Sequence, residues 1–367
     1  MKISVDRKLA YDRIGALAIM KRGFRPAFGC VRLAATESDF IASSCDGELS
    51  TSQAIFAATM KPGVCACDSE RLRGILNAIP DEEVVIALEK DDVVVSSESF
   101  RLSLPAFAVA DLPPMPSRSF DAVAALPFED FGRLVRQVKF AAADELGRYC
   151  MNVAVVEIHA GRLVLWATDG RRLSEAAAAC KSDKSFEDKP LVHKKHWDAV
   201  LKVVAGDGDV RIAFTDSQVT FAGPTGMIVC PRIESTAIDT SAGKPKQWET
   251  TVTLPRQELL AATKAMLLYM DEQSSAMLIS PSKNALKISR SGMLGGKGEV
   301  TVPASVVGAM FKIELSAVYV REFLETLKDV ELTLRFTGQA NSVLFSGANE
   351  DDYRHYVARV CTGVSSE

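Results

Sequence analysis

The sequence has no apolar run of the roughly 18 residues that a membrane-spanning helix needs. Its start also lacks the apolar stretch of a secretory signal peptide, because Lys2, Asp6, Arg7 and Lys8 carry charges there. We therefore expect a cytoplasmic protein without a membrane partner. Hydrophobic residues make up 47% of the 367 residues, which is enough for a large core, and the length favours two or three domains.

Close pairs of metal ligands are scarce. The eight cysteines are scattered and form no Cys-x-x-Cys pair, so reduced thiols are expected. Cys65 and Cys67 would share one face of a strand, but zinc takes four ligands and no second close cysteine pair exists. His193 and His196 lack the helical i, i+4 spacing of a metal pair, and all four histidines are interpreted as surface residues. No metal and no cofactor are expected.

Catalytic motifs are missing as well. The glycines from Gly292 to Gly298 faintly resemble a phosphate-binding loop, but Gly298 stands where Ser or Thr would hold magnesium, and a hairpin loop is the better interpretation. The sequence has no nucleophile elbow, dinucleotide-binding glycine pattern or isolated acid–base pair. We expect no catalytic residues.

An internal repeat is present instead. Apolar residues with helical i, i+3, i+4, i+7 spacing occur at three places, each followed by two alternating strands joined by a polar turn. The helical sets are Leu72, Ile75, Leu76 and Ile79, then Trp197, Val200, Leu201 and Val204, and then Val320, Phe323, Leu324 and Leu327. A further helix and further strands precede each set. The sequence thus predicts an α+β protein of three similar domains.

Two segments without periodicity separate the repeats. Asp111-Leu112-Pro113-Pro114-Met115-Pro116-Ser117 cannot continue a helix or a central strand, and Ser235 to Gln247 is rich in Ser, Thr, Gly and Lys. We place the domains at residues 1–117, 118–240 and 241–367.

The charge is unevenly distributed. The net charge is -4, yet the six expected helices hold 17 Lys and Arg against 11 Asp and Glu, so the rest of the chain carries -10. Solvated helix faces explain such an excess in part. Six similar basic helices on one side of three similar sheets would also present a positive surface to a polyanion.

The segment Ala167-Thr168-Asp169-Gly170-Arg171-Arg172-Leu173 resembles one in the bacterial sliding clamp family, the beta subunit of the replicative DNA polymerase, where it is Ala-Thr-Asp-Gly-His-Arg-Leu. Further similar segments are Arg25-Pro26, Phe100-Arg101-Leu102-Ser103-Leu104-Pro105, Ala110-Asp111-Leu112-Pro113, and Asp144-Glu145 followed by Arg148, Met151 and Val153. The resemblance spans nearly the whole chain.

The resemblance implies a non-catalytic processivity factor that encircles duplex DNA as a head-to-tail dimeric ring, with helices inside and antiparallel sheets outside. It tethers DNA polymerase and clamp-loader subunits through short linear motifs. The residues expected to face DNA are Arg25, Arg73, Arg136, Lys139, Tyr149, Lys194, Lys195 and Lys202. The expected dimer contacts are Leu102 and Leu104 with Leu267 and Leu268.

The resemblance also implies a partner-peptide groove between the second and third domains. Its expected members are Arg148, Met151, Thr168, Gly170, Arg171, Arg172, Leu173, Pro231, Val357 and Arg359. This chain departs from the family there, since Arg171 replaces His, Cys230-Pro231-Arg232-Ile233 replaces Phe-Pro-Asp-Tyr, and Tyr356-Val357-Ala358-Arg359-Val360 replaces a Met-Pro-Met-Arg-Leu ending. A divergent or accessory member with a different partner repertoire is indicated.

Two other classes fit the same residues. One is a repeat-built scaffold that binds proteins without encircling DNA. The other is an enzyme without a recognisable motif.

Overall fold

The computed structural model describes residues 1–17, 26–116, 118–145, 150–270, 275–292, 296–338 and 341–360. They form two compact units. The first comprises Met1–Gly132, Cys180–Lys184 and Lys195–Glu234, and the second comprises Arg133–Ala179, Ser185–Lys194 and Ser235–Glu367. Within the described ranges, no helix combines the length and apolar character needed to span a membrane.

The first unit contains two antiparallel sheets. The five-stranded sheet has the order β5 (Ala57–Lys61), β1 (Lys2–Asp6), β7 (Glu83–Glu89), β8 (Asp92–Ser96) and β9 (Arg101–Pro105). The eight-stranded sheet has the order β10 (Ala124–Pro127), β15 (Asp209–Phe214), β16 (Gln218–Ala222), β17 (Gly226–Pro231), β4 (Ser50–Ile55), β3 (Phe40–Cys45), β2 (Cys30–Ala35) and β6 (Gly63–Asp68). Strands β17 and β4 join chain segments far apart in the sequence.

The second unit also contains two antiparallel sheets. The nine-stranded sheet has the order β14 (Leu191–His193), β11 (Val153–His159), β12 (Arg162–Thr168), β13 (Arg172–Ala179), β26 (Tyr353–Ala358), β25 (Ser342–Ser346), β24 (Glu331–Phe336), β18 (Thr250–Pro255) and β22 (Ser305–Gly308). The four-stranded sheet has the order β21 (Lys297–Pro303), β20 (Ala285–Ser291), β19 (Ala276–Ser282) and β23 (Ile313–Ser316). Here the pairing of β13 with β26 connects distant segments.

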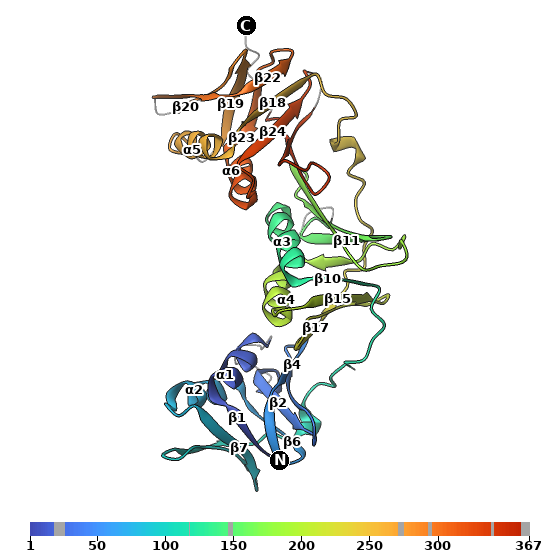
Figure 1. Cartoon of the computed structure of the whole chain (residues 1–367), viewed down its shortest axis with the longest axis vertical. Coiled ribbons are helices and arrows are strands. Elements are labelled where there is room, and N and C mark those ends of the chain that lie inside the picture. Colours follow the sequence, from blue (N-terminus) through green and yellow to red (C-terminus); the bar gives the residue numbers. More distant parts are fainter. Residues whose placement is uncertain are drawn as a thin grey trace. The chain divides into compact units, whose positions relative to one another are not determined.

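Within each unit the helices lie against the sheets (Figure 1). In the first unit α1 (Arg7–Ala16) packs against α2 (Ser69–Ala78), and α4 (Trp197–Val204) packs against β17. In the second unit α5 (Arg256–Leu267) packs against α6 (Ala317–Thr326). Helix α3 (Phe128–Val138) begins in the first unit and ends in the second. The predicted α+β class and the predicted repeat of a helix followed by a hairpin are confirmed in β7–β8, β15–β16 and β24–β25.

The helices begin where the sequence supplies an N-cap. The side chains of Asp6, Asp68 and Ser316 accept hydrogen bonds from backbone N–H groups in the first turns of α1, α2 and α6. The apolar positions then face the core, where Leu72 and Phe323 are fully buried. The repeated apolar spacing therefore gives repeated helices, because each helix buries an equivalent stripe of apolar side chains against its sheet.

Two arginines at equivalent positions tie the helix pairs together. Arg7 at the start of α1 donates to the carbonyl oxygens of Leu76 and Asp81, at 2.9 and 3.1 Å. Arg256 at the start of α5 donates to those of Leu324 and Asp329, at 2.9 and 3.0 Å. The carbonyl groups at the C-terminus of a helix have no N–H donor within the helix. Each guanidinium supplies donors to such carbonyls at and just beyond the end of the neighbouring helix.

Candidate functional site

The motif segment forms the tight turn between β12 and β13. Asp169 Oδ1 accepts the backbone N–H groups of Arg171 and Arg172 at 2.9 and 3.0 Å, and Thr168 Oγ1 accepts that of Gly170 at 3.0 Å. Gly170 has a φ of +85°, which favours glycine, and a Cβ there would lie 3.4 Å from Met151 Sδ. The motif residues therefore fix the backbone of one wall of a pocket.

That pocket lies in the second unit and has a volume of about 160 Å³. Five predicted residues line it, namely Thr168, Gly170, Arg171, Arg172 and Leu173. The other wall comes from β25, β26 and the segment before β18, through Ile238, Asp239, Thr240, Gly243, Ser342, Tyr356 and Ala358. We call this cavity the β13–β26 pocket.

The other predicted groove residues that the structure describes do not line this pocket. Val357 is fully buried and does not line the pocket, because successive side chains of β26 point to opposite faces and Tyr356 and Ala358 occupy the pocket side. Arg359 is exposed and donates to the carbonyl of Gly338 at 3.2 Å. Met151 is half-buried beside Gly170. Pro231 ends β17 in the first unit, and Arg148 lies outside the described residues.

Arg172 is a cation whose side chain is only 9% exposed and whose charge is balanced by carboxylates. Its Nε lies 3.0 Å from Asp169 Oδ2, its Nη2 donates to the carbonyl of Phe140 at 2.7 Å, and its Nη1 pairs with Glu322. The guanidinium also stacks 4.3 Å from the ring centre of Tyr319. Arg172 thus ties β13 to α6, while exposed Arg171 is left as the positive charge at the pocket.

Tyr356 supplies an apolar ring with a neutral hydroxyl. Burial raises the pKa of this phenol to about 12, so it stays protonated and can donate a hydrogen bond. Asp239 adds a carboxylate at the pocket, and hydrogen bonds from Ser241 hold its pKa below the ordinary value. The pocket therefore combines an apolar wall with separate charges of both signs, a composition that suits one anchoring side chain and a polar flank.

Two of the predicted DNA-facing lysines are engaged in ion pairs. Lys194 Nζ lies 2.7 Å from Asp144 Oδ1 and donates to the carbonyl of Ala142 at 2.9 Å. This contact lowers the pKa of Asp144, first through the hydrogen bond and then through the charge of Lys194. Lys195 Nζ lies 2.7 Å from Glu48. Both pairs reduce the charge available to a phosphate.

The other basic residues differ in exposure. Arg136 and Lys202 are exposed and have no charged or hydrogen-bonding partner within the part of the chain that the structure describes. Arg73 stacks 4.8 Å from the ring centre of Tyr11, and Lys139 is half-buried. Arg25 and Tyr149 fall outside the described ranges.

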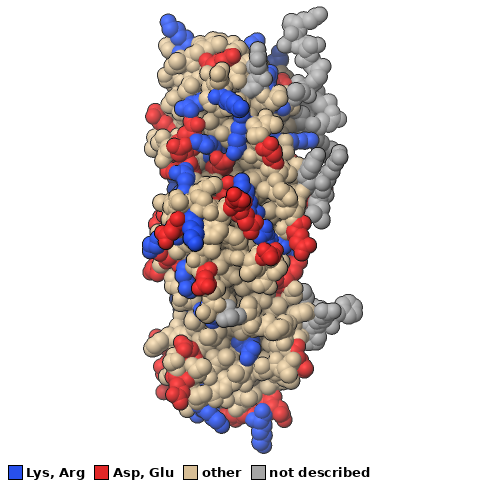
Figure 2. All heavy atoms as spheres, turned by 90° about the vertical axis from the view of Figure 1, so that its right-hand side faces the viewer, with Lys and Arg blue, Asp and Glu red and all other residues tan. Residues whose placement is uncertain are grey.

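Figure 2 shows the right-hand side of the view in Figure 1. Among the residues coloured there, Lys and Arg side chains are interspersed with Asp and Glu side chains. The described residues of this face therefore form no broad positive area that would attract a polyanion.

The predicted dimer contacts lie near two strands at the ends of their sheets. Strand β9 ends the five-stranded sheet and β21 ends the four-stranded sheet. Leu268, just after α5, is 84% exposed and Leu102 on β9 is 37% exposed. Leu104 is buried in the core of the first unit, and Leu267 is half-buried. Leu102 and Leu268 are therefore the two leucines open to a partner.

The histidines correct one sequence-based interpretation. His196 and His355 are buried, and His193 Nε2 lies 2.9 Å from Asn152 Nδ2. Burial, followed by the nearby charge of Arg172, lowers the pKa of His355 to about 3. Among the described residues, no group of three or more His, Cys, Asp or Glu side chains is arranged to hold a metal ion.

Solved structures share this architecture over nearly their whole length. The DNA polymerase sliding clamp from Bacillus subtilis superimposes with a TM-score of 0.90 at 19% identity, covering 99% of each chain. A sliding clamp from Pseudomonas aeruginosa bound to griselimycin gives a TM-score of 0.91 at 19% identity, covering 98% of this chain and 99% of that one. The chain therefore has the sliding-clamp fold.

Sequence relatives agree with the fold. The beta sliding clamp of Rickettsia felis is 23% identical over 314 residues, which are 83% of this chain and 82% of the relative. That of Escherichia coli is 21% identical over 289 residues, 78% of this chain and 79% of the relative. Models of the N-terminal, central and C-terminal domains of the DNA polymerase III beta subunit match residues 1–116, 125–239 and 244–360. With three consecutive matches in the expected order, the chain belongs to the DNA polymerase III beta subunit family.

Proposed function

We propose that this chain is a DNA sliding clamp, two copies of which close into a ring around duplex DNA and tether a DNA polymerase. The observation that carries the proposal is the ordered match of three beta-subunit domains along one chain. This subunit is the non-catalytic processivity factor of its polymerase, so the function is tethering and not chemistry. We also propose domain boundaries at 117/118 and 240/241, and a cytoplasmic location.

The strands at the sheet ends support a head-to-tail ring. One copy would offer its edge strand β9 with Leu102. The other copy would offer a different edge strand, β21, with the nearby Leu268, so the two surfaces are unlike. Unlike surfaces make a heterologous contact, which closes into a ring when the rotation is correct. Pairing the two strands would also cover backbone groups that invite aggregation when left open.

The β13–β26 pocket supports binding of short linear motifs from polymerase and clamp-loader subunits. Its volume of about 160 Å³ suits one bulky apolar side chain, and Leu173 and Tyr356 supply the apolar wall. Arg171 beside it favours an acidic residue next to the anchor. A small detachable contact of this kind lets the enzyme change while the ring stays on DNA.

Retention on circular DNA tests the proposal. Two copies loaded onto nicked circular plasmid by a bacterial clamp loader with ATP should co-migrate with the plasmid in gel filtration at high salt. Cutting the plasmid once should release them, because a ring slides off a free end. A chain that never remains on the circle, or that remains equally on linear DNA at high salt, would contradict encirclement.

A further inference from the structure

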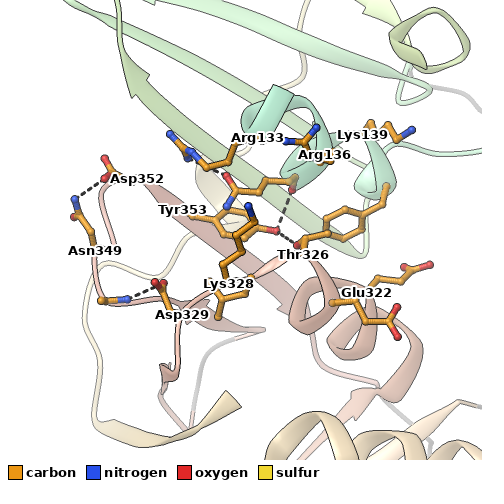
Figure 3. A pocket seen from close by; sticks show the side chains of 15 residues that line it. Arg133, Arg136, Lys139, Glu322, Thr326, Lys328, Asp329, Asn349, Asp352 and Tyr353 are labelled. Atoms are coloured by element: carbon orange, nitrogen blue, oxygen red, sulfur yellow. Dashed lines mark hydrogen bonds between the residues drawn. The ribbon is translucent and has the colours of Figure 1, made fainter. Parts of the chain in front are cut away.

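Glu322 connects α6 with the β13–β26 pocket although it does not line that pocket. It projects from α6 and lines a second cavity of the second unit, which lies between α3 and α6 and has a volume of about 740 Å³ (Figure 3). We call this second cavity the α3–α6 cavity. The carboxylate of Glu322 pairs with Arg172, which does line the β13–β26 pocket. The ion pair therefore runs from α6 to the wall of the proposed peptide site.

The guanidinium of Arg172 is held by several further contacts. It lies 3.0 Å from Asp169 Oδ2 and donates to the carbonyl oxygen of Phe140 at 2.7 Å. The ring centres of Phe140 and Tyr319 lie 5.4 and 4.3 Å from the guanidinium carbon. Because the side chain of Arg172 is mostly buried among these groups, their arrangement fixes where the guanidinium lies.

Asp169 transmits the position of Arg172 to the turn between β12 and β13. Its Oδ2 faces the guanidinium, while its Oδ1 accepts the backbone N–H groups of Arg171 and Arg172 at 2.9 and 3.0 Å. A carboxylate is planar, so a shift that turns one oxygen also turns the other. Arg171 and Arg172 both line the β13–β26 pocket. Displacement of the guanidinium would therefore move the pocket wall.

Two carboxylates compete for the guanidinium of Arg172. The side chains of Asp169 and Glu322 are only 15% and 30% exposed, and water screens such partly buried charges less than exposed ones. Glu322 pulls Arg172 toward α6, and Asp169 pulls it toward the turn. Removing the carboxylate of Glu322 would leave the pull of Asp169 unopposed and would shift Arg172 toward the turn.

We propose that Glu322 is a positioning residue for peptide binding, which acts through Arg172 and Asp169 on the turn that forms one wall of the β13–β26 pocket. This inference rests on the proposed role of that pocket as the site for short linear motifs. It makes the affinity of the pocket depend on α6, a helix that contributes no side chain to the pocket lining. Packed side chains and ion pairs of this kind can carry such a coupling.

Calorimetry tests the proposal with a short neutral peptide, acetylated and amidated, that carries Leu and Phe anchors. Because this peptide has no charge, the loss of a protein charge should not by itself change its affinity. Glu322→Ala should weaken binding roughly tenfold, a size typical of a change within a coupling network. Glu322→Gln keeps a hydrogen-bond acceptor for Arg172 and should weaken binding less, by roughly threefold.

Glu325→Gln is the matched control. Glu325 lies on the same helix and lines the same α3–α6 cavity, but its carboxylate lies 3.0 Å from Lys264 Nζ. The variant removes the same charge as Glu322→Gln and should bind the peptide like the parent. Equal weakening by Glu322→Gln and Glu325→Gln would assign the effect to lost charge on α6 and would overturn the positioning role.

Hydrogen exchange followed by NMR separates positioning from general destabilisation. The amide hydrogens of Arg171 and Arg172, which are bound by Asp169, should exchange faster in Glu322→Ala than in the parent. Those of β19 and β20 in the four-stranded sheet should keep the parent's rates. Faster exchange in all of these elements, or unchanged exchange of Arg171 and Arg172, would overturn the route through Asp169.

The parent protein shows whether the proposed pocket or the proposed role of Glu322 is at fault. A parent that binds no peptide with apolar anchors would contradict the pocket as a motif site, and the role of Glu322 with it. A parent that binds the peptide, together with a Glu322→Ala protein that binds it equally well, would overturn the role of Glu322 alone.

Discussion

Lowering the pH from 7 to 5 should destabilise the second unit through His355. This imidazole is fully buried, and neither ring nitrogen has a hydrogen-bond partner in the described part of the chain. It stacks on Phe323, with ring centres 5.1 Å apart and planes 10° apart, and lies 5.5 Å from the ring of Phe140. The native structure therefore holds a neutral ring between aromatic neighbours.

The size of the effect follows from the pKa of His355. Burial lowers this pKa to about 3, whereas the ordinary value in an unfolded chain is about 6.5. Below pH 6.5 the unfolded chain binds a proton that the native state does not, so the stability present above pH 6.5 is lost as the pH falls toward 3. At pH 5 the loss is about 2 kcal/mol in the free energy of unfolding.

Replacing His355 with Phe removes the titrating group and keeps an aromatic ring in the stack. The difference in unfolding free energy between pH 7 and pH 5 should therefore shrink by about 2 kcal/mol relative to the parent. Urea denaturation in a Trp197→Phe background reports this, because buried Trp166 then gives a fluorescence signal from the second unit. An unchanged pH dependence in His355→Phe would show that His355 does not cause the loss of stability at low pH.

Three other predictions concern separate parts of the molecule. Leu268→Asp should convert a dimer of twice 39.7 kDa into a monomer in sedimentation velocity, because the substitution buries a charge in the proposed interface. The control Val330→Asp changes an equally exposed residue and should remain dimeric. A dimeric Leu268→Asp protein would place the interface elsewhere. Arg256→Ala should lower the unfolding free energy of the second unit by about 3 kcal/mol, since two charged hydrogen bonds to carbonyls are lost. Arg7→Ala should have the same effect in the first unit. Equal protection of amide hydrogens from exchange in each variant and the parent would contradict these losses of stability. Arg171→Ala should weaken binding of a peptide with an acidic residue beside its apolar anchor by about two- to fivefold and leave a neutral peptide unaffected in calorimetry; equal losses for both peptides would show that Arg171 supports the pocket in another way.

The helices and hairpins could be predicted because their signals are local. The apolar stripe of Trp197, Val200 and Val204 fixes one helix face, and the alternation in β15 and β16 fixes a hairpin, without knowledge of any distant contact. The turn at Thr168 to Leu173 could be located for the same reason, since its hydrogen bonds run between residues at most four apart.

The rest of the site depends on contacts between distant segments. Which face of β26 meets the pocket is set by its pairing with β13, where Leu173 lies opposite Tyr356, and the sequence carries no mark of that register. Ile238 and Gly243 line the β13–β26 pocket from a segment whose lack of periodicity predicted a linker. Lys194 looked available for DNA because Asp144, its ion-pair partner, is 50 residues away.

Tracking single molecules on DNA held at both ends shows whether the protein encircles DNA. Labelled clamps loaded by a bacterial clamp loader should diffuse along the duplex, with a residence time that hardly changes as salt is raised, because topology and not charge retains them. Cutting the duplex should release every clamp that reaches the free end. Clamps that leave intact DNA rapidly at high salt, or that stay bound at a cut end, would contradict encirclement.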